Sequence, residues 1–124
     1  MNKKSNNWLV KHKKDQFFKQ SKIEGFRSRS AFKLIEMNQK FKFLKKKISL
    51  LDIGSSPGGW SQVASKEITN GRILAVDIKS MEKISNVDFI KGDINENEIH
   101  QKIMVYFNNK ADVVLSDAAA NTTG

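Results

Sequence analysis

One segment of the chain indicates its fold most clearly, Ile48-Ser-Leu-Leu-Asp-Ile-Gly-Ser-Ser-Pro-Gly-Gly-Trp60. Its first six residues form a short apolar run that ends at Gly54, which is typical of a buried parallel strand. The Gly-rich loop that follows leads into a helical pattern over residues 60–68, and a second apolar run occupies residues 72–77. This region is therefore predicted to form a βαβ unit.

Strands and helices alternate on both sides of this unit. Upstream, apolar residues recur at helical spacing from Ser28 or Ser30 to Phe41. Downstream, strands are predicted over residues 87–91 and 111–117, with a helix over residues 96–107 between them. This order predicts an α/β fold with a doubly wound parallel sheet of the Rossmann-like kind.

Positive charge is concentrated in the first part of the chain. The formal net charge is +9, and residues 1–47 hold 15 Lys and Arg against three acids, whereas residues 48–124 hold 7 against 10. Seven aromatic residues are interleaved with the charge of residues 1–47, where an additional helix is predicted to begin at Ser5. We expect a basic helical segment, 1–47, that binds RNA, and a separate domain portion, 48–124. A solvated Lys-rich surface is the alternative interpretation. The candidate RNA-binding residues are Lys11, Lys13, Lys14, Arg27 and Arg29.

Several classes of protein are excluded by composition. The 124 residues fit one domain. No apolar run approaches the roughly 20 residues of a membrane span, and the first residues contain no apolar core of a signal peptide, so a cytoplasmic protein without a membrane partner is expected. With no Cys and two His, neither a disulfide framework nor a metal site is expected.

Acidic residues stand at the carboxyl ends of all four predicted strands: Asp52, Asp77, Asp93 and Asp117. One such Asp is more often a turn former or a helix cap, but four at the edge where open parallel sheets bind ligands indicate a binding site. The loop after Asp52 lacks the G-x-G-x-x-G pattern that holds a pyrophosphate. Because Asp77 can accept both hydroxyls of a ribose, a ligand with a ribose diol and no pyrophosphate fits best.

Three segments together resemble the FtsJ/RrmJ family of ribosomal RNA methyltransferases. They are Arg27-Ser-Arg-Ser-Ala-Phe-Lys-Leu34, Asp52-Ile-Gly-Ser-Ser-Pro-Gly-Gly-Trp-Ser-Gln62 and Ser116-Asp117. The resemblance implies a fold that binds S-adenosylmethionine, with residues 48–124 as the N-terminal half of the methyltransferase domain. It also implies 2′-O-methylation of a uridine ribose in 23S rRNA of the large (50S) ribosomal subunit.

The resemblance further implies roles for individual residues. Lys33 and Asp117 match the first Lys and the Asp of the Lys-Asp-Lys-Glu tetrad that surrounds the target hydroxyl in this family. Asp77 would contact the ribose of the cofactor, Asp93 would lie near its adenine, and Asp117 would lie beside the methyl group. The cofactor-binding residues expected are Asp52, Gly54, Ser56, Pro57, Gly58, Gly59, Trp60, Asp77, Ile78, Asp93, Ile94 and Asp117.

The sequence departs from the family pattern at its end. It stops at Gly124, seven residues after Asp117, before the second Lys and the Glu of the tetrad. We therefore expect an N-terminal portion of a methyltransferase, with C-terminal strands missing and the strand over residues 111–117 left as an apolar edge. Two alternatives stay open. In the first, the chain is a catalytically incomplete RNA-binding or ribosome-associated module. In the second, which the missing G-x-G-x-x-G pattern disfavours, it is a nicotinamide-dependent oxidoreductase.

Overall fold

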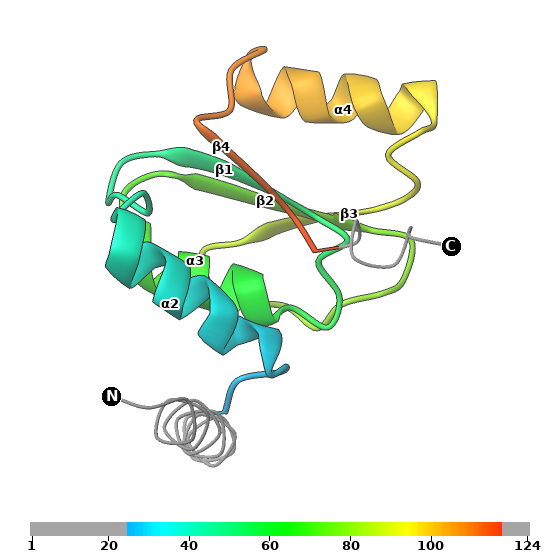
Figure 1. Cartoon of the computed structure of the whole chain (residues 1–124). Coiled ribbons are helices and arrows are strands. Elements are labelled where there is room, and N and C mark those ends of the chain that lie inside the picture. Colours follow the sequence, from blue (N-terminus) through cyan, green and yellow to red (C-terminus); the bar gives the residue numbers. More distant parts are fainter. Residues whose placement is uncertain (1–24, 118–124) are drawn as a thin grey trace, which may run out of the picture.

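A computed structural model describes residues 25–117 of the chain, which form a parallel sheet with helices on both faces (Figure 1). The predicted elements within this range are confirmed to within two residues at their ends, and the helix predicted to begin at Ser5 starts outside it. The helices are α2 (Ser30–Phe41), α3 (Gly59–Glu67) and α4 (Asn97–Phe107), and the strands are β1 (Ser49–Ile53), β2 (Arg72–Asp77), β3 (Asp88–Lys91) and β4 (Val113–Ser116).

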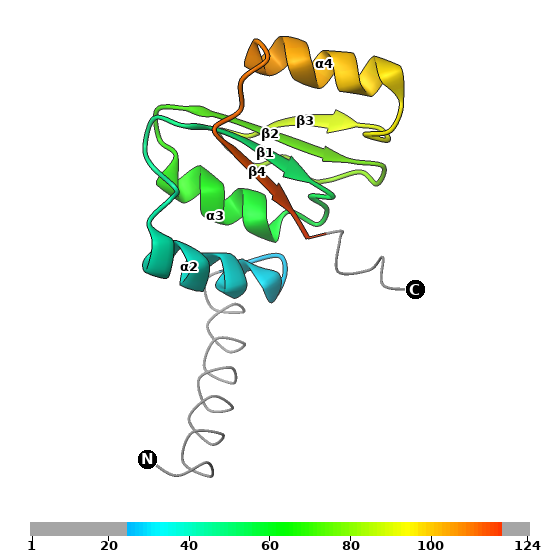
Figure 2. The same ribbon diagram turned by 45° about the horizontal axis from the view of Figure 1, so that its top comes forward.

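The strands lie in the order β3-β2-β1-β4, and every neighbouring pair is parallel. Leu51 of β1 is aligned with Leu74 of β2 on one side and with Val114 of β4 on the other. All four strands therefore end at the same edge of the sheet (Figure 2). The predicted α/β fold with a doubly wound parallel sheet is confirmed.

Consecutive residues of β1 serve two hydrophobic cores, because successive side chains of a strand point to opposite faces. Leu50 packs beneath α2 and α3, whereas Leu51 packs beneath α4. The first core contains Ala31, Leu34, Leu44, Leu50, Trp60, Val63, Ala64, Ile68, Ile73 and Leu115. The second contains Leu51, Leu74, Val76, Ile99, Ile103 and Phe107.

Helix α2 packs directly against α3 and contributes Ala31 and Leu34 to the first core. The proposed division of the chain at residue 47 stays a prediction.

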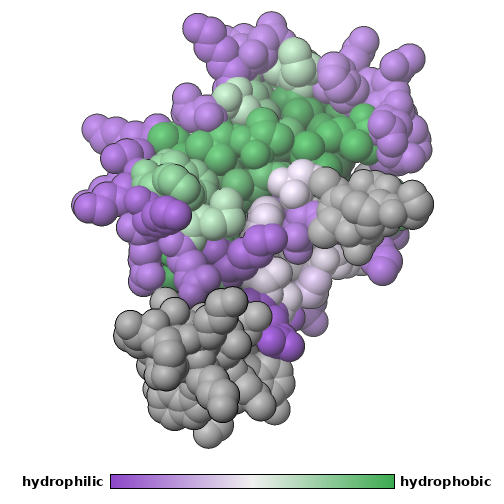
Figure 3. All heavy atoms as spheres, viewed as in Figure 1, coloured by the Kyte–Doolittle hydropathy of each residue, from purple (hydrophilic) through white to green (hydrophobic). Residues whose placement is uncertain are grey.

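Within the described residues β4 forms one border of the sheet, and its Val114 side chain is 57% exposed. Figure 3 shows an apolar band along this strand and beneath α4. Between residues 25 and 117, no helix is long and apolar enough to cross a membrane.

Candidate active site

The loop after β1 is fixed to the end of β2. The backbone N–H groups of Gly54 and Ser55 both donate to the carbonyl oxygen of Val76, at 2.8 and 3.2 Å. Gly58 has φ = 118°, a conformation that side chains with a Cβ rarely adopt, and it directly precedes α3. The loop therefore has one defined path between the strand and the helix, along which its backbone is open to a ligand.

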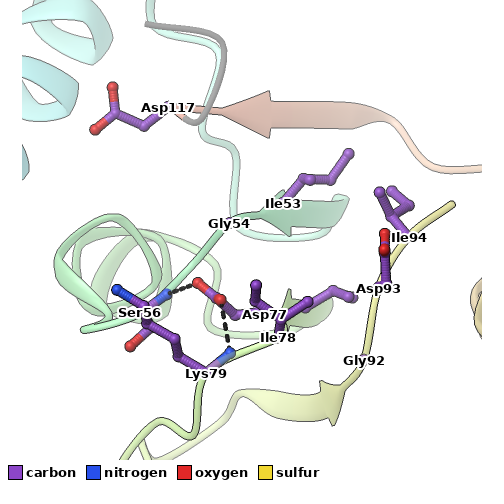
Figure 4. A pocket seen from close by; sticks show the side chains of 11 residues that line it. Ile53, Gly54, Ser56, Asp77, Ile78, Lys79, Gly92, Asp93, Ile94 and Asp117 are labelled. Carbon is purple, nitrogen blue, oxygen red and sulfur yellow. Dashed lines mark hydrogen bonds between the residues drawn. The ribbon is translucent and has the colours of Figure 1, made fainter. Parts of the chain in front are cut away.

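Asp77 ends β2 and is held by two backbone hydrogen bonds. The N–H of Ser56 donates to its Oδ2 at 2.8 Å, and the N–H of Lys79 donates to its Oδ1 at 2.9 Å (Figure 4). An ionised carboxylate offers about four acceptor positions, so each oxygen keeps capacity for a further donor. The carboxylate is thus oriented in advance to accept two donors from a ligand.

Asp93 is placed next to Asp77 by a bond between two strand ends, since the N–H of Gly92 donates to the carbonyl oxygen of Asp77 at 2.9 Å. The Asp93 carboxylate accepts from the N–H of Asn95 at 2.9 Å, which fixes its orientation. Both acids line a cavity of about 400 Å³ that we call the outer compartment. Its lining consists of Ile53, Gly54, Ser56, Val76, Asp77, Ile78, Lys79, Gly92, Asp93, Ile94 and Asp117.

A second cavity, of about 240 Å³, adjoins the first, and we call it the inner compartment. The two share Gly54, Ser56 and Asp117, so they form one crevice that Asp117 borders on both sides. The inner compartment is lined by Ser28, Ser30, Asp52, Gly54, Ser55, Ser56, Pro57, Gly59, Trp60 and Asp117. The Ser55 side chain is 6% exposed, and its Oγ has no hydrogen-bond partner within the described residues. A buried hydroxyl without a partner is costly, so this atom is a candidate contact for a polar group of a ligand.

Asp52 is almost completely buried at the base of the crevice, where the Ser61 hydroxyl donates to its Oδ2 at 2.7 Å. The pKa of Asp52 is raised from 3.8 to about 6, mainly because the carboxyl is buried. The Ser61 hydrogen bond acts to lower this pKa, and the nearby charges of Asp117 and Asp77 act to raise it. A cationic ligand would relieve their mutual repulsion.

Arg27 fastens the segment before α2 to two loops. Its guanidinium donates to the carbonyl oxygens of Pro57 at 3.0 Å, Glu82 at 2.7 Å and Lys83 at 3.1 Å, and its backbone N–H donates to Gln62 Oε1 at 2.8 Å. A Cβ at Gly58 would lie 3.0 Å from the guanidinium, so glycine permits this close approach. We call these four hydrogen bonds the Arg27 clamp.

The start of α2 is fixed to the same loop by two further contacts. The indole Nε1 of Trp60 donates to the carbonyl oxygen of Ser30 at 2.7 Å, and a Cβ at Gly59 would overlap Ser28 Oγ. These contacts explain why Ser28 and Ser30 line the inner compartment. Sequence spacing alone did not identify either serine as a site residue, because both lie about thirty positions before the loop they face.

Most of the expected cofactor residues meet in the crevice. Of the twelve, only Gly58 lines neither compartment, since it is buried behind the loop against Arg27. Residues not expected from the sequence are Ser28, Ser30, Ile53, Ser55, Val76, Lys79 and Gly92. Five of them directly adjoin an expected residue, so the neighbourhood of the expected residues gave a signal for Ile53, Ser55, Val76, Lys79 and Gly92.

The two expected catalytic residues are placed differently. Asp117 follows β4 and borders both compartments, whereas Lys33 is exposed on α2 and is not among the described residues that line the crevice. Arg29 is exposed just before α2, and the Arg27 side chain is engaged in the clamp. Lys11, Lys13 and Lys14 lie outside the described residues. The RNA contacts of these five basic residues stay predictions.

No metal site is apparent in this part of the chain. Among residues 25–117, no group of three or more His, Asp or Glu side chains is arranged to hold a metal ion. The described lining of the crevice consists of four Asp, four Ser, Lys79 and apolar residues, with backbone from the loop after β1.

Known proteins resemble this chain over most of its length. Residues 26–124 match the family described as FtsJ-like methyltransferase. Ribosomal RNA large subunit methyltransferase E of Pelagibacter ubique is 49% identical over 123 residues, which cover 99% of this chain and 61% of the relative. The protein of the same name from Marinobacter nauticus is 46% identical over 124 residues, with coverage of 98% and 60%. The chain thus spans about 60% of the length of these curated relatives.

A solved structure resembles the fold as well as the sequence. The crystal structure of a ribosomal RNA methyltransferase from Plasmodium falciparum superposes with a TM-score of 0.68 at 39% identity. The superposition covers 75% of this chain and 56% of that one.

Proposed function

The chain belongs to the FtsJ-like methyltransferase family, and from this premise we propose that it forms the cofactor-binding part of an enzyme that methylates ribosomal RNA. The methyl group comes from S-adenosylmethionine and goes to the 2′-hydroxyl of a uridine ribose in 23S rRNA of the large (50S) subunit, in the cytoplasm. The observation that supports this proposal most strongly is the crevice in which carboxylates surround the fixed loop after β1.

The charge of the crevice suits S-adenosylmethionine. When bound, this cofactor supplies a methyl group on a positively charged sulfur. The crevice residues Asp52, Asp77, Asp93 and Asp117 bring negative charge to two adjoining cavities, against which only Lys79 is cationic among the described lining residues. Opposite charge within a partly buried site favours a cationic ligand.

The outer compartment suits a nucleoside. Each Asp77 oxygen accepts one backbone N–H and keeps capacity for one hydroxyl of a ribose diol. Ile78 is 64% exposed and lines the same cavity with Ile94, so a flat adenine ring would cover apolar surface that otherwise faces water. Asp93 would accept a hydrogen bond from a polar group on that ring.

The inner compartment suits the amino-acid end of the cofactor. The unpartnered Ser55 hydroxyl would bond to a carboxylate or an amino group there, and Gly59 and Trp60 allow the ligand to approach backbone at the start of α3. Because Asp117 borders both compartments, its carboxylate is suited to stabilise a positive centre between them.

Asp117 and Lys33 are our candidates for handling the target ribose. Asp117 would orient the hydroxyl or a neighbouring ammonium group beside the crevice, since in-line positioning lowers the barrier for a weak nucleophile. Lys33, exposed one turn into α2, would bind the RNA at the mouth of the crevice. The remaining groups of the family's tetrad would come from a segment equivalent to the C-terminal part of the relatives.

The proposal is tested by transfer of labelled methyl from S-adenosylmethionine to large ribosomal subunits that lack this modification. The chain is assayed alone and joined to the C-terminal part of a relative. We expect label in rRNA with the joined chain, and a loss of at least about 100-fold with Lys33→Ala or Asp117→Ala. Lys102→Ala, on the outer surface of α4, is the matched control and should keep full activity.

Three other results distinguish the alternatives. RNA binding without transfer by the joined chain would favour the RNA-binding module. Transfer by the chain alone would show that the site needs no further tetrad residues. Full activity of Asp117→Ala would contradict the role proposed for this carboxylate.

A further inference from the structure

A second charged region lies at the other end of α2 from the crevice. It consists of Lys40, Phe41, Lys42, Lys45, Lys46 and Lys47, and we call it the lysine surface. All five lysines are exposed, and Phe41 is 64% exposed. Within residues 25–117 none of the five forms an ion pair, since the one found in that range joins Lys102 and Glu98. Hydrophilic side chains gather around this end of α2 in Figure 3.

The backbone beneath the lysine surface is held in one conformation. Lys42 ends α2 with φ = 50° and donates its N–H to the carbonyl oxygen of Asn38 at 2.7 Å. The side chain of Asn38 then accepts the N–H of Leu44 at 2.9 Å, and Leu44 is buried in the first core. Further on, the carbonyl oxygen of Lys46 accepts the N–H of Asn70 at 2.8 Å. The lysines are therefore presented by a fixed turn.

The chemistry of this turn suits a single strand of RNA. Five lysines bind phosphates in a way that depends on salt, and an exposed aromatic ring gives a base a surface on which to stack. The Lys40 ammonium lies 5.3 Å from the centre of the Phe41 ring, so a stacked base would also meet a cation. Phe41 and its lysines are thus grouped as in proteins that bind unpaired nucleotides.

Helix α2 spans the distance between the crevice, which Ser30 lines, and the lysine surface. Lys33 and Lys40 are seven residues apart, which places them two turns apart on the same face, and both are exposed. Residues 33–47 hold six lysines and one acid, Glu36. From Ser30, which lines the inner compartment, to Phe41 the helix rises about 17 Å.

We propose that substrate RNA follows this face of α2, with a base stacked on Phe41 and phosphates bound by Lys42, Lys45, Lys46 and Lys47. This inference rests on the proposed function, because it assumes that RNA enters at the crevice. It adds a contact remote from the reacting ribose, which holds an unpaired nucleotide a few positions along the strand.

The test measures binding of a fluorescent oligouridylate of about twelve nucleotides to the chain over about 50 to 200 mM salt. Phe41→Leu should weaken binding about 10-fold, while Phe41→Trp should retain affinity and show quenching of its fluorescence by the stacked base. Val105→Ala is the matched control, since Val105 is an exposed apolar residue on α4. Binding of S-adenosylmethionine should be unchanged in all three variants.

The lysines are tested by their effect on salt dependence. Lys45→Ala with Lys46→Ala should reduce the slope of log affinity against log salt by about 1.4. Lys102→Ala with Lys110→Ala removes the same charge on and after α4 and should leave the slope unchanged.

Four results would overturn the inference. Equal affinity of wild type and Phe41→Leu for the oligouridylate would exclude stacking. Equal salt slopes for the two double lysine variants would mean that Lys45 and Lys46 contribute no more to RNA binding than lysines elsewhere on the surface. Loss of binding to phosphatidylserine vesicles by Phe41→Leu, with RNA binding unchanged, would assign the surface to a membrane. Failure of the wild-type chain to bind any RNA would contradict the proposed function as well, whereas the first three results leave it intact.

Discussion

The crevice and the lysine surface lie at opposite ends of α2 and hold charge in opposite ways. Asp52, Asp77 and Asp93 each accept a hydrogen bond from a group of the protein, which fixes the carboxylates in place. The lysines from Lys40 to Lys47 stand in solvent on a fixed turn. Fixed, partly buried charges can select one small ligand by geometry, whereas exposed charges attract a polyanion along its length. We therefore expect ligand affinity in the crevice to depend on the position of individual side chains. On the lysine surface we expect affinity to depend on the sum of several charges.

The largest effect is expected from Asp77→Ala. It removes a carboxylate with two backbone N–H partners and with capacity for both hydroxyls of a ribose. Two hydrogen bonds to a charged group contribute about 1.5 to 3 kcal/mol each, so affinity for S-adenosylmethionine should fall at least about 100-fold in a calorimetric titration. Glu98→Ala, an exposed carboxylate on α4, should bind as wild type does. A similar fall in both variants would mean that overall charge, and not the geometry of the crevice, binds the cofactor.

Asp52→Asn should stabilise the folded chain in a way that depends on pH. Because the folded state raises the Asp52 pKa from 3.8 to about 6, it binds this proton more tightly than the unfolded chain does. The stability gained from that proton is complete below pH 3.8 and is lost as the pH rises through 6. A pKa difference of this size corresponds to about 3 kcal/mol.

The asparagine variant avoids that loss, since its amide oxygen can still accept the Ser61 hydroxyl. Urea unfolding should show a gain of up to about 3 kcal/mol near pH 8 and almost none near pH 4. Lys45→Ala, on the lysine surface, should show no such dependence. An equal gain for Asp52→Asn at both pH values would contradict the conclusion that ionisation of buried Asp52 destabilises the folded chain.

Ser55→Ala should move stability and binding in opposite directions. The Ser55 hydroxyl is buried without a partner in the described residues, so its removal should raise the free energy of unfolding by about 1 kcal/mol. The same change should weaken S-adenosylmethionine binding about fivefold, because the ligand loses a hydrogen bond. Ser65→Ala loses a bond to the carbonyl oxygen of Ser85 outside the crevice and should be destabilised with unchanged affinity. Unchanged affinity of Ser55→Ala would remove the hydroxyl from the proposed contacts.

Arg27→Lys should weaken cofactor binding as little as Ser55→Ala does, since lysine keeps the charge but cannot reproduce the Arg27 clamp. One ammonium cannot reach the three carbonyl oxygens that the guanidinium joins, so cofactor affinity should fall about fivefold. The salt dependence of RNA binding should stay as in wild type. Arg72→Lys, at the start of β2, is the matched control. A fall in RNA affinity with unchanged cofactor affinity would instead make Arg27 an RNA-binding residue.

Local sequence was sufficient to predict the strands and most of the crevice. The apolar run before Gly54 predicts a buried strand from adjacent residues alone. The acids that end the strands are predicted to meet at one edge because the strands are parallel. The sequence therefore predicts that Asp77 and Asp93 lie at the same edge of the sheet. The ends of β4 were the least well predicted, because polar residues on either side of its short apolar core fit the same pattern.

Contacts between distant segments could not be predicted from the sequence. Ser30 reaches the inner compartment because Trp60 binds its carbonyl oxygen, and the two residues are thirty positions apart. The Arg27 side chain serves three carbonyl oxygens in two loops, a role that its basic character does not indicate. Ser55 lies inside the motif, but only the packing around it shows that its hydroxyl has no partner among the described residues.

The most direct measurement is a calorimetric titration of the 124-residue chain with S-adenosylmethionine, in parallel with Asp77→Ala and the Lys45→Ala, Lys46→Ala double variant. The described residues that line the crevice lie between Ser28 and Asp117 of this chain. We predict saturable binding by wild type and by the lysine variant, with equal affinity that changes less than about threefold between about 50 and 200 mM salt, and no detectable binding by Asp77→Ala. Absence of binding by wild type, or binding by Asp77→Ala as tight as that of wild type, would contradict the assignment of the crevice to this cofactor.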